Sequence, residues 1–212
     1  MAAVMRIVSL ILIVLTTSSA VRAAAPEGSP PVHVLSSSPN GVSRVYGNIR
    51  LMSTSAETLY IYNGVTDTKQ VMVRAPFRYR PEITWYGNTC VRVMVGTGSP
   101  GRYSVFYDLP ANAKSPELWF VIVYDPKRKI ALLGGERLEL VSVFSGRRVL
   151  AITPADLPTT AFTFLVVEHA EFDRDGDLRI EYRNTSGGKS KLVVTSDEIA
   201  ARLNKQKDRA LR

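Results

Sequence analysis

Apolar and polar residues alternate with a period of two over much of the chain, most clearly from residue 43 onward. Short runs rich in Val, Ile, Tyr, Phe and Thr recur, and turn-forming residues separate them. Such alternation is typical of strands with one buried face, and its regular recurrence is typical of a β-sandwich or β-barrel. The pattern therefore predicts an all-β fold.

The segments that fit the strand pattern are 43–52, 58–63, 70–74, 82–86, 90–95, 102–109, 118–124, 129–133, 137–144, 147–153, 161–172, 178–183 and 191–195. Gly64, the pair Gly134 and Gly135, and Gly146 lie between successive runs, where we expect the positive φ of tight hairpin turns. Hairpins between consecutive strands give antiparallel pairing. The alternation slips near Val141, which predicts a β-bulge. The run 118–124 is apolar on both faces, which predicts a central strand.

The segment 110–116 is the best candidate for a linker or crossover, because its two prolines disfavour a continuous ladder. It separates a β-sandwich module over 32–109 from a second module over 117–195. Each has the size of an immunoglobulin-like sandwich, and one larger sandwich is the alternative. The predicted fold class is thus an antiparallel β-sandwich of immunoglobulin-like architecture, in one large or two small modules.

One helix is predicted, at the C-terminal end over 196–212. Thr195 and Glu198 have the spacing of a capping box, and Ile199, Ala200 and Leu203 follow on one face. The far end of this segment is rich in Lys and Arg, which suits the negative end of a helix dipole. We therefore expect a short basic helix that ends in a tail.

The first 23 residues have the layout of a secretory signal peptide. Arg6 precedes an apolar run over 7–15, and small residues follow up to a plausible cleavage site after Ala23. This run is too short to cross a bilayer as a helix, which needs about 20 residues. We expect the signal to be removed, residues 24–31 to form a flexible lead, and the protein to be secreted or periplasmic, with no transmembrane segment left.

Composition excludes two kinds of protein, a wholly disordered chain and a domain held together by disulfides. The chain has 212 residues, 45% of them hydrophobic and 22% charged, which fits a globular protein and excludes wholesale disorder. Cys90 is the single cysteine, so no intramolecular disulfide framework can form. Its place in an alternating run predicts a small buried side chain.

Charge suggests a binding surface. The chain carries a net charge of +8, and six basic residues but only one acid lie between Lys69 and Arg102, with aromatic residues interleaved. Arg and aromatic side chains together can hold an anionic polymer or glycan by ion pairing and stacking. The predicted binding residues are Arg74, Arg78, Tyr79, Arg80, Trp85 and Arg92. The alternative is a solvated sheet face.

A second candidate site is acidic. Asp173, Asp175 and Asp177 alternate as in a calcium-binding loop, but Leu178 and Asn184 stand where an EF-hand has Gly and Glu. Pairing Phe172 with Leu178 keeps the apolar residues of both strands on one face, and leaves 173–177 as a hairpin loop. We consider a calcium site and a plain acidic turn as alternatives, with no other cofactor expected.

No catalytic motif is found. The sequence has no G-x-S-x-G, H-E-x-x-H, C-x-x-C or phosphate-loop pattern, and His33 and His169 are its only histidines. The leading hypothesis is an exported, non-enzymatic protein that binds or scaffolds envelope or extracellular components, with no nucleic-acid partner. The alternatives are a secreted hydrolase or carbohydrate-active enzyme, and a calcium-stabilised adhesion module.

Overall fold

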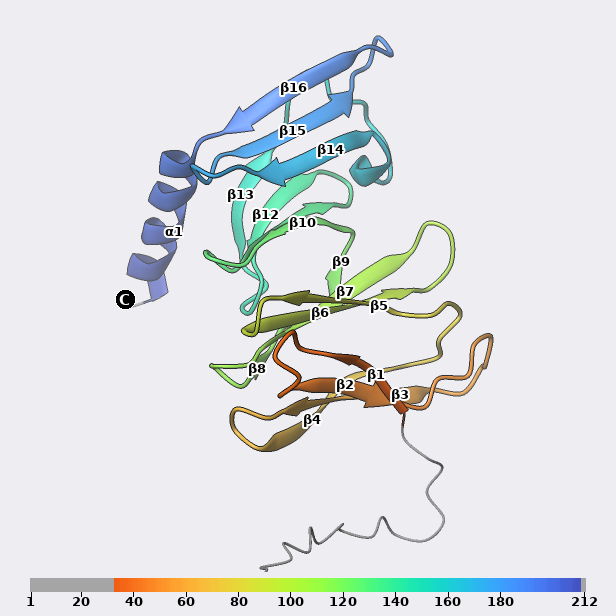
Figure 1. The fold of residues 1–212 in the computed structure, drawn as a ribbon. Helices are drawn as coiled ribbons and strands as arrows, with labels where there is room; N and C mark the ends of the chain where they lie inside the picture. Colours follow the sequence, from red (N-terminus) through yellow and green to blue (C-terminus); the bar gives the residue numbers. More distant parts are fainter. Residues whose placement is uncertain (1–32, 211–212) are drawn as a thin grey trace, which may run out of the picture. The chain divides into compact units, whose positions relative to one another are not determined.

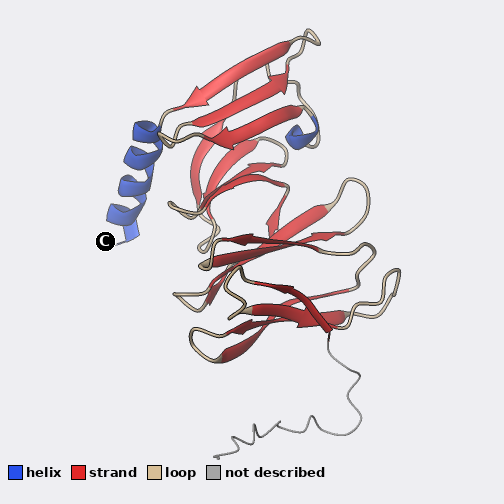
Figure 2. Cartoon of the chain, in the orientation of Figure 1, coloured by secondary structure: helices blue, strands red, loops and turns tan. Residues whose placement is uncertain are grey.

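The computed structural model describes residues 33–210. The predicted signal peptide (1–23) and flexible lead (24–31) lie outside the described residues. The described residues form sixteen β-strands, one short 3₁₀ helix and one α-helix at the C-terminal end (Figures 1 and 2). The prediction of an all-β antiparallel fold with a short C-terminal helix is confirmed.

Four antiparallel sheets follow one another along the chain, and with one exception in the second sheet, neighbouring strands are consecutive in sequence. The first sheet contains β1 (His33–Ser37), β2 (Arg44–Gly47), β3 (Glu57–Asn63) and β4 (Thr68–Ala75). The second contains β5 (Glu82–Tyr86), β6 (Cys90–Gly96), β7 (Arg102–Asp108) and β8 (Ala113–Lys114), and β9 (Leu118–Trp119) also pairs with β7.

The third sheet contains β10 (Val121–Asp125), β11 (Ile130–Gly134), β12 (Leu138–Ser142) and β13 (Arg148–Ile152). A 3₁₀ helix, η1 (Thr163–Leu165), leads into the fourth sheet, which contains β14 (Val167–Phe172), β15 (Leu178–Arg183) and β16 (Lys189–Val194). Helix α1 (Ser196–Ala210) follows β16.

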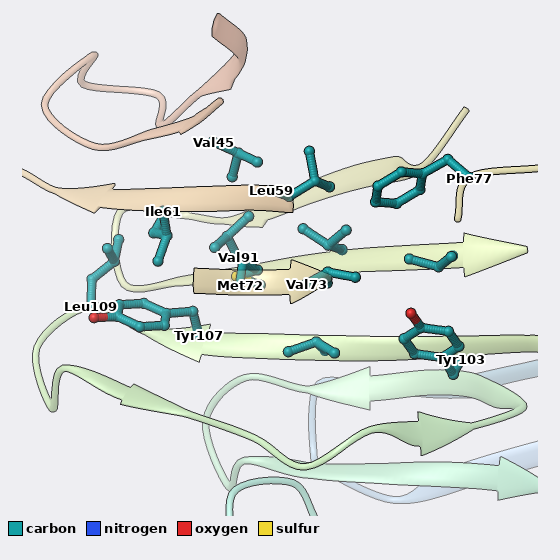
Figure 3. Close-up of a cluster of buried hydrophobic side chains, with 13 residues drawn as sticks. Val45, Leu59, Ile61, Met72, Val73, Phe77, Val91, Tyr103, Tyr107 and Leu109 are labelled. Atoms are coloured by element: carbon teal, nitrogen blue, oxygen red, sulfur yellow. The ribbon is translucent and has the colours of Figure 1, made fainter. Parts of the chain in front are cut away.

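Three clusters of buried side chains join successive sheets face to face. The first joins the first and second sheets and is shown in Figure 3, where Leu59 and Val73 lie with Val91 and Tyr107. The second cluster joins the second and third sheets. The third joins the third and fourth sheets and includes Ile199 of α1. The second and third sheets are therefore buried on both faces.

Strand β7 shows this double burial. Tyr103, Val105 and Tyr107 belong to the cluster on one face. Phe106 belongs to the cluster on the other face, where its ring centroid lies 4.6 Å from that of Tyr124. The polar residues of β7 on this second face, Ser104 and Asp108, are buried as well.

The prediction of one central strand over 118–124 is wrong. Phe120 has a φ of 58°, so the chain turns there and leaves β9 on the second sheet and β10 at the edge of the third. Both faces are apolar because the segment contacts two sheets in succession. The predicted linker over 110–116 contains β8, whose Lys114 is aligned with Tyr107 of β7.

The predicted turn glycines differ in role. Gly146 has the expected positive φ of 66°, but Gly64, Gly134 and Gly135 are not among the glycines with positive φ. Gly134 lies in β11, where an added Cβ would come within 2.7 Å of the backbone nitrogen of Phe164. A side chain is excluded there by close approach of the chain, and not by backbone conformation.

Several local predictions are confirmed. Phe172 pairs with Leu178, and residues 173–177 form the hairpin loop. The ladder between β12 and β13 shifts register at Leu140 and Val141, as the predicted bulge requires.

The predicted strand over 161–172 is shorter, because η1 occupies its start.

We predict that Gly134→Ala lowers stability by roughly 1–3 kcal/mol, because the new methyl group overpacks a site that backbone atoms close. Gly188→Ala is the control, since its added Cβ would meet only side-chain atoms, those of Asn184 at 3.5 Å and Oγ of Ser186 at 3.8 Å. Urea denaturation of both variants checks this. Equal midpoints for the two variants would contradict the close packing of η1 on β11.

Candidate functional site

The connections on one side of the first two sheets form a continuous surface. In an antiparallel meander every second connection lies at the same end of the strands. The backbone N–H of Met52 donates to the carbonyl of Phe77 at 3.0 Å, and the rings of Tyr103 and Trp119 lie 5.3 Å apart. We call the surface formed by residues 48–56, 74–81, 96–103 and 117–120 the rim.

Two of the cavities that open on the rim are lined by both its arginines and its aromatic side chains. The larger, of about 650 Å³, is lined by Met52, Arg74, Arg78, Thr97 and Trp119, together with neighbouring residues. It therefore brings residues from all four segments of the rim into one site. The smaller, of about 320 Å³, is lined by residues that include Tyr79, Arg80, Gly98 and Arg102.

Two glycines allow the basic and aromatic side chains to lie close to the loop over 97–101. An added Cβ at Gly96 would lie 3.2 Å from Cδ2 of Tyr79, and one at Gly98 would lie 3.0 Å from Nη1 of Arg78. Gly98 also has a φ of 130°, a conformation that side chains strongly disfavour. The backbone of this loop thus forms part of the surface on which Arg78 and Tyr79 rest.

Three exposed arginines of the rim have no carboxylate partner within the described residues. Among residues 33–210, no ion pair is found for Arg74, Arg78 or Arg80, and all three side chains are exposed. Many basic residues of the third and fourth sheets do form ion pairs, namely Arg128, Lys129, Arg137, Arg148, Arg179, Arg183, Lys189 and Lys191. On the rim itself Arg50 lies 4.0 Å from Glu57, and Glu117 lines the larger cavity. The exposed positive charge that no ion pair of the described residues neutralises is therefore that of Arg74, Arg78 and Arg80.

Four of the six predicted binding residues lie on the rim, and two do not. Nε of Arg92 donates to Oγ of Ser104 at 2.9 Å and Nη2 donates to the carbonyl of Val121 at 3.4 Å, so Arg92 lies between the second and third sheets. Nε1 of Trp85 donates to Oγ of Ser36 at 2.8 Å, and its ring packs against the first cluster. These contacts give Arg92 and Trp85 structural roles.

Sequence reasoning missed Trp119. Its indole is 43% exposed and lines the larger cavity, although its neighbour Leu118 is buried. Every second connection of an antiparallel meander lies at the same end of the strands. This rule, applied to the predicted strands, could have placed residues 117–120 beside residues 97–101.

Hydrogen-bond donors of the protein itself hold the Asp173 and Asp177 carboxylates of the acidic loop over 173–177. Oδ1 of Asp173 accepts from the backbone N–H groups of Asp175 and Asp177 at 3.0 Å each, and Oδ2 accepts from Nε of Arg179 at 2.7 Å. The hydrogen bond from Arg179 is the main reason that the pKa of Asp173 lies below its ordinary value. Oδ1 of Asp177 accepts from the backbone N–H of Ser196 at the start of α1.

Arg128 connects this loop to the third sheet. Its Nη2 donates to the carbonyl of Gly176 at 2.5 Å, and its Nε pairs with Asp125. Within the described part of the chain, no group of three His, Cys, Asp or Glu side chains is placed to hold a metal ion. A calcium ion would have to compete with Arg179 and with the N–H of Ser196, and calcium binding at Asp173, Asp175 and Asp177 stays a prediction.

Cys90 and His169 do not form a nucleophilic pair. Cys90 is buried, and Oη of Tyr124 donates to its Sγ at 3.6 Å. Burial raises the pKa of the thiol to about 11, so it stays protonated at neutral pH. His169 is on the exposed side of β14, with Nε2 3.5 Å from Oε2 of Glu171.

No protein-family model matches the chain, and no curated protein matches it. Among solved structures the chain is similar to TolB from Acinetobacter baumannii, with 12% sequence identity and a TM-score of 0.35. The match covers 79% of this chain and 41% of that chain, so this chain spans well under half of that protein's length. A likeness with this TM-score supports no conclusion about function.

We predict that Arg179→Gln raises the pKa of Asp173, because the variant loses the hydrogen bond that lowers it. A lowered pKa in the folded state contributes stability above the unfolded-state pKa, and this contribution is lost as the pH falls through the folded-state value. The variant should therefore lose less stability on acidification. Titration of the carboxyl carbon by NMR measures the pKa directly.

Arg183→Gln is the matched control, since Arg183 lies on the same strand and pairs with Glu168 instead. It should raise the pKa of Glu168 and leave that of Asp173 unchanged. An Asp173 pKa that is the same in wild type and Arg179→Gln would contradict the assignment.

Proposed function

We propose that this is an exported, non-enzymatic binding protein that holds an anionic component of the envelope or extracellular space on its rim. One observation carries the proposal. Arg74, Arg78 and Arg80 are exposed, have no ion pair within the described residues, and adjoin cavities that aromatic side chains line.

Unpaired arginines suit this role for a physical reason. An arginine already bound to a carboxylate must give up that partner before it binds another anion, whereas Arg74, Arg78 and Arg80 have no such partner within the described residues. A guanidinium can form two parallel hydrogen bonds to a carboxylate, sulfate or phosphate. Several positive charges beside a cavity also raise the local concentration of anions and speed their association.

The exported location rests on the sequence. The signal-peptide pattern over 1–23 supports secretion or a periplasmic location. Within residues 33–210, no helix has the length and apolar character needed to span a bilayer. If the signal is removed with Arg6 and Arg22, the net charge falls from +8 to +6, and the mature protein still favours anionic partners.

The acidic loop supports a hydrolase less well than the rim supports binding. Asp173 and Asp177 already accept hydrogen bonds from Arg179 and Ser196, and these bonds hold them in structural positions. A calcium-stabilised adhesion module depends on the calcium hypothesis for the same loop. The rim offers exposed groups that are free to contact a partner.

We predict that Arg78→Glu with Arg80→Glu weakens binding to an immobilised anionic glycan by roughly tenfold at low ionic strength, since two exposed charge contacts become repulsive. The difference should shrink as salt is added, because exposed charges are screened. Retention on the glycan column at several salt concentrations measures both effects.

The control is Arg202→Glu with Lys205→Glu on the exposed part of α1, which changes net charge by the same amount. It should bind nearly as well as the wild type. Equal weakening by the two double variants would mean that net charge alone attracts the glycan, and would remove the rim as the site.

A further inference from the structure

We propose that Trp119 is the stacking platform for an acidic saccharide on the rim, with the carboxylate of the sugar bound by Arg74 and Arg78. This inference rests on the proposed function, and it names the ligand class and a residue that the sequence did not indicate. The chemistry in question is a sugar ring with one apolar face, hydroxyl groups at its edge and an acidic substituent.

Trp119 is held in place although its indole is exposed. Strand pairing aligns Trp119 with Tyr103 of β7, and their ring centroids lie 5.3 Å apart. The next residue, Phe120, has a φ of 58° and packs on Phe162 and Phe164 at centroid distances of 4.9 and 5.1 Å. An exposed aromatic ring with fixed neighbours loses little conformational entropy when a ligand stacks on it.

Trp119 lines two cavities. The larger rim cavity contains Arg74 and Arg78. A third cavity, of about 700 Å³, is lined by Trp119, Phe120, Arg137 and Phe162 among others. Arg137 is paired with Glu139 at 2.7 Å, so the unpaired positive charge lies on the side of the larger cavity. An acidic group should therefore enter beside Arg74 and Arg78.

The remaining polar groups suit sugar hydroxyls. Glu117 lines both cavities, and Ser53, Thr54 and Thr97 line the larger one. A carboxylate and several hydroxyl side chains can accept and donate hydrogen bonds to a polyhydroxylated ring. The site thus combines an aromatic plane, unpaired arginines and hydroxyl-binding groups around one point.

Other anionic or apolar partners use only part of this site. A phosphate polymer would satisfy the arginines but would leave the indole face uncovered. An acyl chain would cover Trp119 but would leave Arg74 and Arg78 facing an apolar surface, which is unfavourable. An acidic saccharide satisfies all three kinds of group, because tryptophan can stack on its apolar face while charged groups bind its edge.

The test uses tryptophan emission. The chain has two tryptophans, so Trp85→Phe leaves Trp119 as the single reporter. We expect a short oligogalacturonate to produce a saturable change in emission, and a neutral oligosaccharide of the same length to produce none. Inorganic polyphosphate, which would contact the arginines and leave the indole face uncovered, should produce a much smaller change. In the chain with both tryptophans, Trp119→Ala should weaken oligogalacturonate binding at least tenfold by calorimetry, whereas Trp119→Phe should retain most of it. Circular dichroism verifies that each variant is folded.

The outcomes separate this inference from the proposed function. Unchanged affinity in folded Trp119→Ala, with binding still weakened in Arg78→Glu with Arg80→Glu, would overturn the stacking platform and leave the rim as an anion-binding surface. An equal emission change with polyphosphate would overturn the saccharide as the ligand class. Absence of binding to any anionic probe would overturn both proposals.

Discussion

Burial of both faces of the second and third sheets is the constraint on which the rest of the structure depends. Phe106 and Ala131 contribute to the cluster between these two sheets, while Tyr107 and Ile130 on the opposite faces contribute to the outer clusters. Hydrophobic burial on each side stabilises the stack, but any polar group on these strands then needs a partner inside the protein. Asp108 is buried on β7 and is paired with Lys129, which follows β10. In the same layer Arg92 donates hydrogen bonds to the hydroxyl of Ser104 and to the backbone carbonyl of Val121.

This constraint also determines where binding can occur. Side chains on both faces of the second and third sheets pack against neighbouring sheets. Binding partners can therefore reach these two sheets only at the ends and edges of their strands. The rim is such an end, and two features make it distinctive. Glycines at 96 and 98 let side chains lie directly on a loop backbone, and arginines without carboxylate partners adjoin exposed aromatic rings. Ion pairs on the third and fourth sheets neutralise charge there, for example where Glu168 binds both Arg183 and Lys189.

The period-two pattern was sufficient to predict strands, the bulge at Val141 and the register of Phe172 with Leu178, because these depend on neighbouring residues. Predictions that depended on distant packing were less successful. The apolar run over 118–124 has no local sign of the turn at Phe120, which two different sheets impose. Arg92 was predicted to bind a ligand or to lie on a solvated sheet face, because alternation in β6 gives no sign that the third sheet covers its side of the strand. The division into modules over 32–109 and 117–195 stays a prediction, although the cluster between the second and third sheets supports cooperative unfolding.

Native-state hydrogen exchange tests the central claim directly, since it reports the free energy at which each strand opens. If the two inner sheets depend on each other for burial, the backbone amides of β7 and β11 should exchange last and with the same free energy of opening. Edge strands such as β1 and β14 should exchange earlier. Exchange of β7 at a much lower free energy than β11 would contradict the account, because it would show that the second sheet opens while the third stays folded.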